Sequence, residues 1–110
     1  MHHRNTRIYQ RALQLNALAA KSIPSLPQGY AFLADQLRRS TSSVALNFAE
    51  AHGKQSPRER RRFFRIAKGS ALESAAAFEV AAHLDALPTS VSEEAQDLCD
   101  HIAAMLHRYR

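Results

Sequence analysis

Hydrophobic residues recur every three or four positions through most of the chain, which is the spacing of one face of an α-helix. Near the start, Ile8, Ala12, Leu15 and Ala19 keep this spacing and predict a helix from about residue 4 to residue 22. Near the end, the same spacing follows Val91, Ala95, Leu98, Ile102, Met105 and Tyr109. The pattern predicts an all-α protein.

Prolines and glycines set the ends of the first two predicted helices. Pro24 and Pro27 end the first one, because proline lacks a backbone N–H and restricts the residue before it. The second helix is predicted from about residue 29 to residue 52, and Gly53 ends it.

The third predicted helix has the clearest start. Ser56-Pro57-Arg58-Glu59 has the order of a capping box, with serine as N-cap, proline in the first turn and glutamate three residues after the serine. This helix is predicted to continue to residue 87, and the fourth begins at about Ser90. Because the connections are short, we expect one up-down-up-down four-helix bundle over residues 1–110.

The composition makes the core of this bundle thin. Of 110 residues, 50 are hydrophobic, but 20 of these are alanine and only 26 are Val, Ile, Leu, Met or Phe. A small domain with such a core is marginally stable alone, which favours self-association. The single Cys99 cannot form an internal disulfide, and the sequence has neither a signal peptide pattern nor an apolar run long enough to span a membrane. We therefore expect a cytoplasmic protein that is not inserted into a membrane.

Charge is unevenly distributed along the chain, which has a formal net charge of +5. Residues 1–70 hold 13 Lys and Arg against three acidic residues, whereas residues 71–110 hold two Arg against seven acidic residues. This asymmetry favours an anionic partner on one surface. A solvated surface with uneven charge is the alternative.

The second predicted helix carries an unusual polar stripe beside its apolar one. At 100° per residue, one arc contains Gln36, Arg39, Ser40, Ser43, Asn47 and Glu50. Most of these side chains are uncharged hydrogen-bonding groups, which suit partly buried contacts. The arc is therefore predicted to face another helix or another subunit, and an ordinary polar face is the alternative.

The third predicted helix begins with a cluster of cations that we call the basic face. Within about 120° on a helical wheel it contains Arg58, Arg61, Arg62, Arg65 and Lys68. Guanidinium groups bind phosphate bidentately, so this face predicts non-specific affinity for nucleic acid. Arg4, Arg7 and Arg11 form a second basic line on the first helix. Neither line is accompanied by a zinc-finger or RNP-type motif, so base-specific reading is not predicted.

Small residues follow the basic face, from residue 67 to residue 77. Gly69 in a helix interior costs about 1 kcal/mol relative to alanine, which predicts that another backbone passes close to it. Glu73 lies one turn further, where it can pair with Arg62 or Arg65, or with Arg39 across an interface. An exposed glutamate is the alternative.

Signals for catalysis and metal binding are weak. Glu79 and His83 have the i, i+4 spacing that can share a metal, but no HExxH or CxxC pattern occurs. There is no glycine-rich phosphate loop and no nucleophile motif, and Cys99 is interpreted as a structural thiol. The sequence therefore predicts a non-enzymatic protein with no cofactor and no metal.

Two segments resemble a known family. One contains Gln36-Leu37-Arg38-Arg39-Ser40 and Ser43-Val44-Ala45-Leu46-Asn47-Phe48-Ala49-Glu50; the other contains Arg62-Phe63-Phe64-Arg65-Ile66-Ala67-Lys68-Gly69-Ser70 and Glu73. Together they resemble the bacterial four-helix bundle proteins of 23S rRNA intervening sequences, and the accessory variability proteins of diversity-generating retroelements are similar. The resemblance extends from Tyr9 to Leu87 and weakens in the fourth helix. Ala51 stands where the family usually has glycine, and Tyr9 stands where it usually has tryptophan.

The resemblance implies a four-helix bundle that assembles as a ring-like homopentamer with a basic surface. Members of the retroelement branch bind nucleic acid and a reverse transcriptase. The implied partners are therefore further copies of the chain, DNA or RNA, and a reverse transcriptase or another protein. The signature residues carried over by position to helix or subunit contacts are Gln36, Arg39, Ser43, Asn47, Glu50, Gly69, Ser70 and Glu73.

Two functions agree with these predictions. The first is a homo-oligomer that binds nucleic acid non-specifically through the basic face. The alternative is a protein-interaction scaffold with no nucleic-acid role, and the charge pattern favours the first only slightly. A neighbouring reverse transcriptase gene, toxin–antitoxin pair or rRNA gene would distinguish between them.

Overall fold

A computed structural model describes residues 3–109, and every regular element among them is helical. Two short 3₁₀ helices, η1 (His3–Asn5) and η2 (Ile23–Ser25), flank the first long helix. The long helices are α1 (Arg7–Ser22), α2 (Ala31–His52), α3 (Pro57–His83) and α4 (Thr89–Arg108).

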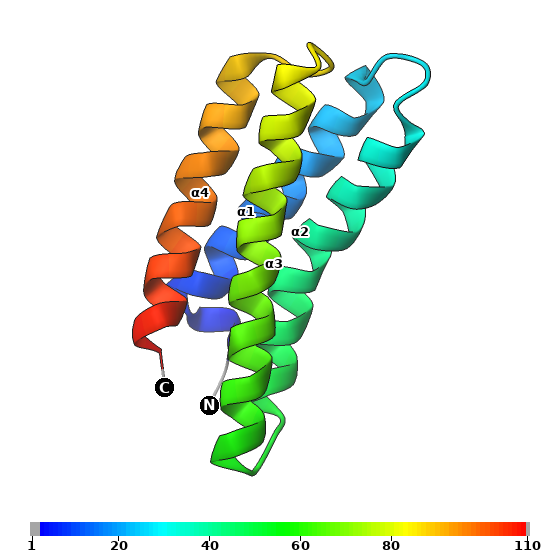
Figure 1. Ribbon diagram of the computed structural model, residues 1–110. Coiled ribbons are helices and arrows are strands. Elements are labelled where there is room, and N and C mark those ends of the chain that lie inside the picture. The colour runs from blue at the N-terminus through cyan, green and yellow to red at the C-terminus, as the bar shows by residue number, and fades with distance from the viewer. Residues whose placement is uncertain (1–2, 110) are drawn as a thin grey trace.

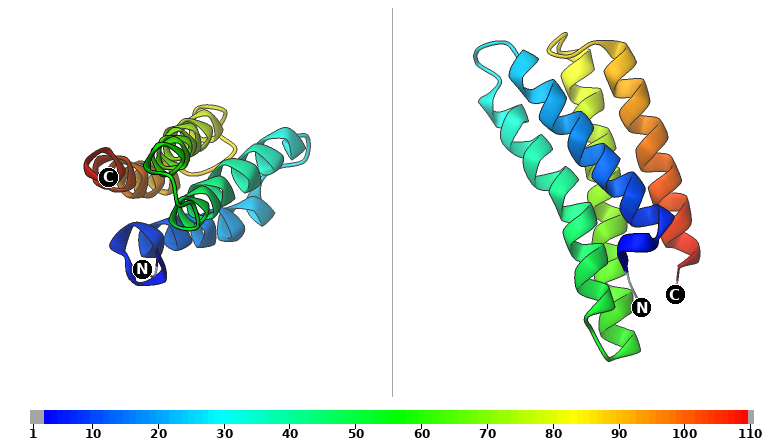
Figure 2. Two further views of the ribbon diagram at one scale, coloured as in Figure 1. Left: turned by 90° about the horizontal axis from the view of Figure 1, so that it is seen from below. Right: turned by 180° about the vertical axis from the view of Figure 1, so that it is seen from behind.

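The four long helices run antiparallel to their neighbours in the chain (Figure 1). Helix α3 packs extensively against both α2 and α4, while α1 closes the bundle between α2 and α4. The α2–α3 connection lies at the same end as the start of α1 and the end of α4, and the other two connections lie at the opposite end (Figure 2). The bundle measures 44 × 21 × 19 Å. The predicted all-α four-helix bundle is confirmed.

Side-chain caps define the starts of two helices. The Ser56 hydroxyl accepts a hydrogen bond from the backbone N–H of Glu59 at 3.3 Å, as the capping pattern predicts. Helix α1 begins at residue 7 instead of residue 4, because the Thr6 hydroxyl accepts from the backbone N–H of Tyr9 at 3.1 Å. The residues before Thr6 form η1 instead of a further turn of α1.

Left-handed backbone conformations account for two other differences from the predicted boundaries. Helix α2 begins at residue 31, because Gly29 has φ of +96° and this conformation cannot belong to an α-helix. Helix α3 ends at residue 83, four residues before the predicted end, and Asp85 beyond it has φ of +58°. Aspartate tolerates this conformation better than most residues.

The core combines a few large side chains with many alanines. Phe48, Phe78, Leu15, Leu37 and Ile102 are fully buried, and the alanine positions let the helices approach closely. Several buried hydroxyls donate to carbonyl oxygens of their own helices, as Ser74 does to the carbonyl oxygen four residues earlier at 2.8 Å. No helix in the described part of the chain is long and apolar enough to cross a membrane.

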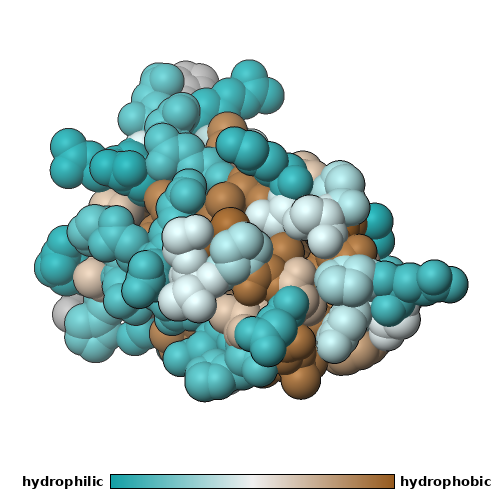
Figure 3. All heavy atoms as spheres, turned by 90° about the horizontal axis from the view of Figure 1, so that it is seen from above, coloured by the Kyte–Doolittle hydropathy of each residue, from teal (hydrophilic) through white to brown (hydrophobic). Residues whose placement is uncertain are grey.

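Apolar side chains also reach the surface. At the end that carries the α1–α2 and α3–α4 connections, hydrophobic atoms lie exposed between hydrophilic ones (Figure 3). The exposed large hydrophobic residues of the described chain are Leu13, Phe32, Leu46, Ile66, Leu72, Val80 and Leu84.

Candidate nucleic-acid interface

The basic face occupies the first half of α3, near the α2–α3 connection. Its four arginine side chains are exposed, and Lys68 is half-buried. The structure divides the cluster into two parts. Arg61, Arg65 and Lys68 line a groove between α3 and the end of α4, whereas Arg58 and Arg62 lie outside this groove.

The arginines outside the groove have only weak contacts. Arg62 lies 3.8 Å from the carboxylate of Glu59 and 5.2 Å from the ring centre of Phe63. Such exposed ion pairs contribute about 0–1 kcal/mol, so Arg62 remains able to bind another anion. Arg60 has a different role, because its Nη1 donates to the carbonyl oxygens of Lys54 at 3.0 Å and Gln55 at 2.8 Å. It fixes the α2–α3 connection.

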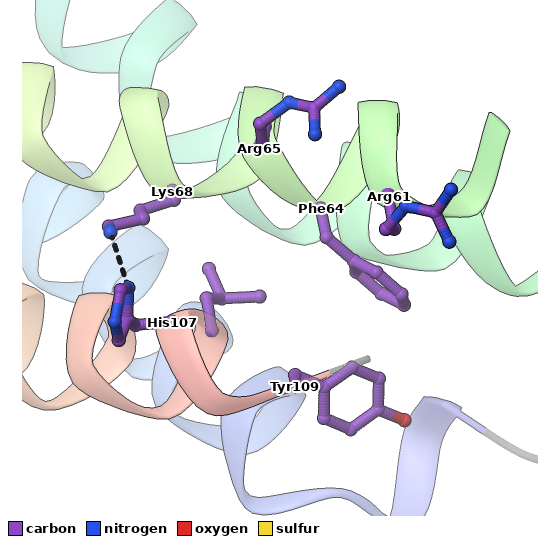
Figure 4. A pocket seen from close by; sticks show the side chains of 7 residues that line it. Arg61, Phe64, Arg65, Lys68, His107 and Tyr109 are labelled. Atoms are coloured by element: carbon purple, nitrogen blue, oxygen red, sulfur yellow. Dashed lines mark hydrogen bonds between the residues drawn. The ribbon is translucent and has the colours of Figure 1, made fainter. Parts of the chain in front are cut away.

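The groove between α3 and α4 is shown in Figure 4 and has a volume of about 310 Å³. We call it the cationic groove. Its lining residues are Arg61, Phe64, Arg65, Lys68, Leu106, His107 and Tyr109. Three of the seven are permanent cations and none is acidic, so the groove concentrates positive charge without an internal counter-charge.

One hydrogen bond crosses the groove. Lys68 Nζ lies 3.2 Å from His107 Nδ1, which joins α3 to α4 (Figure 4). Because an ammonium group can only donate, Nδ1 of His107 is the acceptor and Nε2 carries the imidazole proton. The pair therefore carries N–H donors on both α3 and α4, and it brings no carboxylate with it.

Tyr109 forms the other end of the groove and is held by an aromatic cluster. Its hydroxyl lies 2.9 Å from His52 Nε2, and His52 Nδ1 lies 3.0 Å from the carbonyl oxygen of Phe48. A carbonyl only accepts, so Nδ1 donates and Nε2 accepts the tyrosine proton. The Phe64 ring packs edge-on against Tyr109 with 4.8 Å between ring centres, and burial raises the pKa of Tyr109. The Tyr109 ring thus has a fixed orientation.

The second basic line lies on η1 and α1. Arg4 and Arg7 are exposed, and Arg11 is partly buried with its Nη1 donating to Gln14 at 3.2 Å. These arginines do not line the cationic groove.

The polar arc of α2 lies along the contact between α2 and α3, which we call the polar seam. The hydroxyls of Ser43 on α2 and Ser70 on α3 are 2.7 Å apart. Asn47 Nδ2 donates to both the carbonyl oxygen and the hydroxyl of Ser43, at 2.9 and 2.8 Å. Ser40 is buried and donates to the carbonyl oxygen of Gln36 at 2.8 Å. The uncharged members of the arc therefore find hydrogen-bond partners within the chain.

The charged members of the seam lie at its outer edge. Arg39 and Glu50 are exposed; Arg39 reaches Gln36 at 3.5 Å, and Glu50 pairs with Lys54 at 3.0 Å. Among residues 3–109, Glu73 is exposed and forms no ion pair, so the predicted pairing with Arg62 or Arg65 is wrong, while pairing with Arg39 across an interface stays a prediction.

The predicted close approach at Gly69 is also wrong within this chain. A Cβ atom added there meets no atom within 4 Å, and Gly69 is exposed. The glycine is on the outer surface of α3, where helix spacing puts it away from both neighbouring helices. Its cost to helix stability is therefore not offset by packing inside the bundle.

The sequence matches the family described as 23S rRNA-intervening sequence protein over residues 4–108. The chain belongs to this family. The fold is also similar to that of a solved protein with unknown function from the S23 ribosomal protein family of Bacteroides thetaiotaomicron. The TM-score is 0.82 and the identity is 19%, over 90% of this chain and 94% of that one, so the likeness shows the fold. No curated protein matches the sequence.

In this 23S rRNA-intervening sequence protein, the weaker sequence signals do not form a site. Glu79 and His83 are both exposed, and the described residues contain no group of three His, Cys, Asp or Glu that can hold a metal ion. Cys99 is fully buried, and burial together with the negative charge of Asp100 raises its pKa to about 12. A thiol in this environment is neutral and inert.

Sequence reasoning missed the α4 side of the groove in this family member. Tyr109 stands on the apolar line of the last predicted helix, and His107 has no motif around it. The bond between Lys68 and His107 spans 39 residues of sequence, so no local spacing reveals it. The one sequence signal for this side of the groove was that His107 and Tyr109 follow a last segment that is otherwise acidic.

Proposed function

We propose that the protein is a non-enzymatic homo-oligomer that binds nucleic acid without sequence preference through the basic face. The observation that carries this proposal is the cationic groove, which three cations and His107 line without any acidic residue. The exposed Arg58 and Arg62 extend the same charge along α3. Phosphate groups are the ligands that such arginine clusters recognise. The proposal includes a cytoplasmic location, which a nucleic-acid partner and the single cysteine both favour.

The distribution of charge over the bundle supports this proposal. The acidic residues of the last third lie mostly in the half that carries the α3–α4 connection; they include Glu79, Asp85, Glu93, Glu94 and Asp97. The opposite half contains the basic face, Arg4, Arg7 and Arg108. A polyanion is therefore attracted more strongly to the end that carries the basic face than to the other end.

Self-association is the second part of the proposal. Phe32 and Leu46 on α2 are 58% and 67% exposed, and Leu72 and Val80 on α3 are 53% and 46% exposed. These side chains lie on the two helices that form the polar seam. Exposed apolar side chains on two adjacent helices favour burial against another chain where they form a contiguous patch. A homopentamer is the assembly that the family resemblance supports.

The nucleic-acid part is tested by fluorescence anisotropy with generic DNA and RNA at two salt concentrations. We expect the logarithm of affinity to fall with the logarithm of salt concentration by about 0.9 for each phosphate contact on duplex DNA. Replacing Arg58, Arg62 and Arg65 with glutamine lowers both the affinity and this slope for all sequences alike, because phosphate contacts carry no sequence information. The fold survives because these side chains are exposed. Unchanged binding by the triple variant contradicts the proposal.

The assembly part is tested by light scattering at micromolar concentration. We expect a mass several times that of the 12.3 kDa chain. A clean monomer would exclude self-association while leaving the nucleic-acid proposal intact.

A protein-interaction scaffold is the second candidate function, and the exposed apolar residues of α2 and α3 favour it. Its partner would be a reverse transcriptase or another protein. No binding of DNA or RNA at low salt, together with a stable oligomer, would select this function.

A further inference from the structure

The cationic groove differs from an ordinary basic surface because rings line it as well as cations. Lys68 and His107 meet at one end, and the side chains of Phe64 and Tyr109 lie toward the other (Figure 4). The Arg61 and Arg65 guanidinium groups stand along the α3 side. Positive charge and flat aromatic surfaces therefore occur within one concave site.

A double helix cannot use these rings. The flat faces of its bases are stacked inside, so it presents only sugars, phosphates and base edges to a protein. The volume of about 310 Å³ is also at the lower end of the range of about 300–1,000 Å³ for small-ligand pockets. Such a space admits part of one flexible strand and excludes a duplex.

An unpaired nucleotide can bind both to the cations and to the aromatic rings that line the groove. Every base has a flat face that stacks on aromatic side chains or guanidinium planes, whatever its identity. The N–H groups of Lys68 and His107 suit the phosphate of the same strand, because Lys68 keeps donors beyond the one given to His107 and both residues line a groove with no acidic residue. The hydrogen bond from Tyr109 to His52 holds the ring in place before a ligand arrives, which lowers the entropy lost on binding.

We infer that the cationic groove is a binding site for an unpaired nucleotide within single-stranded nucleic acid, with its phosphate at Lys68 and His107 and its base against Tyr109. The inference rests on the proposed function, and it adds the class of nucleic acid and the place where it binds. Arg58 and Arg62, outside the groove, contribute charge that does not distinguish single strands from duplexes.

The decisive experiment compares three probes that carry equal numbers of phosphates. They are a fluorescein-labelled oligothymidylate, an abasic strand of the same length and a hairpin duplex closed by a linker without bases, with oligouridylate in a further arm to separate RNA from DNA. At one low salt concentration, we expect oligothymidylate to bind about 5- to 150-fold more tightly than the abasic strand, which is the range expected for one stacked base. The hairpin should bind as weakly as the abasic strand, because neither offers an unpaired base.

Matched variants locate the effect in the groove. Tyr109→Leu should abolish the preference over the abasic strand, whereas Tyr109→Phe should keep it because the ring remains. Lys68→Gln should weaken the binding of single strands more than that of the hairpin. Arg58→Gln is the control outside the groove, and it should weaken all probes by the same factor. Circular dichroism establishes that each variant remains helical.

The outcomes separate this inference from the proposed function. Equal, salt-dependent binding of oligothymidylate, abasic strand and hairpin would overturn the inference and leave non-specific nucleic-acid binding in place. A preference that survives Tyr109→Leu in a folded protein would also overturn it. Absence of binding to every probe at low salt would overturn the proposed function and the inference together.

Discussion

Helix α3 has two sides that use polar side chains in opposite ways. Toward α2, in the polar seam, small uncharged groups such as Ser43, Asn47 and Ser70 bond to one another at 2.7–2.9 Å. Toward α4, in the cationic groove, Lys68 donates to the neutral His107, and no acidic residue lines the site. The polar groups of the seam have hydrogen-bond partners within the chain. The groove, in contrast, has more hydrogen-bond donors than acceptors and a positive charge that no acidic residue of its lining balances.

This difference distinguishes polar groups that stabilise the fold from polar groups that are available to a ligand. A polar group that is satisfied inside the fold stabilises the contact it occupies, because leaving it unpaired when buried costs about 1–3 kcal/mol. A cluster of like charges without acceptors does not stabilise a fold, and it becomes favourable only when an anion binds. The seam therefore holds the two helices together, and the groove is the site that we propose for a ligand.

The largest expected effect comes from placing the same charge on the two sides of α3. Ser70→Asp puts a carboxylate at a buried position with no cation opposite, and we expect a loss of about 3–5 kcal/mol in the free energy of unfolding. Lys68→Glu, two residues away on the groove side, should cost less than about 0.5 kcal/mol because that surface is hydrated. Urea denaturation followed by circular dichroism measures both. Equal losses would show that the two sides do not differ as described.

Alkaline pH tests how strongly the fold depends on a buried neutral thiol, which lies in the core and not in the hydrated groove. The pKa of Cys99 is raised from 9.0 to about 12 by burial and by Asp100. Its neutral thiol therefore stabilises the fold fully below pH 9, and this contribution is lost as the pH rises toward 12. We expect the free energy of unfolding to fall by up to about 1.4 kcal/mol per pH unit in this window. Denaturation curves of the parent protein and of Cys99→Ala should diverge in slope above pH 9, with Tyr109→Phe in both backgrounds to remove the tyrosine titration.

A smaller effect is expected from the seam's own hydrogen bonds. Asn47→Leu removes two bonds to Ser43, and because Asn47 is only half-buried we expect a loss of about 1 kcal/mol. Ser42→Ala is the control, since the Ser42 hydroxyl bonds only to backbone carbonyl oxygens of α2, at 2.7 Å from that of Arg38, and has no bond to the Ser43 hydroxyl that reaches Ser70 on α3. Thermal melts would contradict this view of the seam if both substitutions changed the melting temperature equally.

The smallest expected change in the free energy of unfolding comes from Gly69, on the outer surface of α3. Gly69→Ala adds a methyl group that meets no atom within 4 Å, so the chain should gain about 0.5–1 kcal/mol from better helix propensity. If this outer surface packs against a second copy, the added methyl group lowers the mass seen by light scattering while the helix itself is strengthened. A destabilised monomer would show that Gly69 has a contact inside the bundle after all.

Local sequence features predicted most of the fold. The 3.6-residue periodicity, the prolines and the Ser56–Glu59 cap fixed the number of helices and the start of α3. The predicted end of α3 was four residues too late, because the left-handed conformation at Asp85 is not obvious from an aspartate followed by alanine and leucine. The site was predicted less completely: the basic face was identified as one cluster, but His107 and Tyr109 were not assigned to it.

The sequence by itself therefore determined the four helices, the family and the position of the cations along α3, since these depend on local propensity and on motifs read in order. Only the tertiary structure decided which cations share a groove, because that depends on how α3 is rotated between α2 and α4. It also showed that Gly69 faces outward and that Lys68 meets His107, 39 residues away. Contacts of this kind arise from the packing of whole helices, and the identity of neighbouring residues in the chain does not specify them.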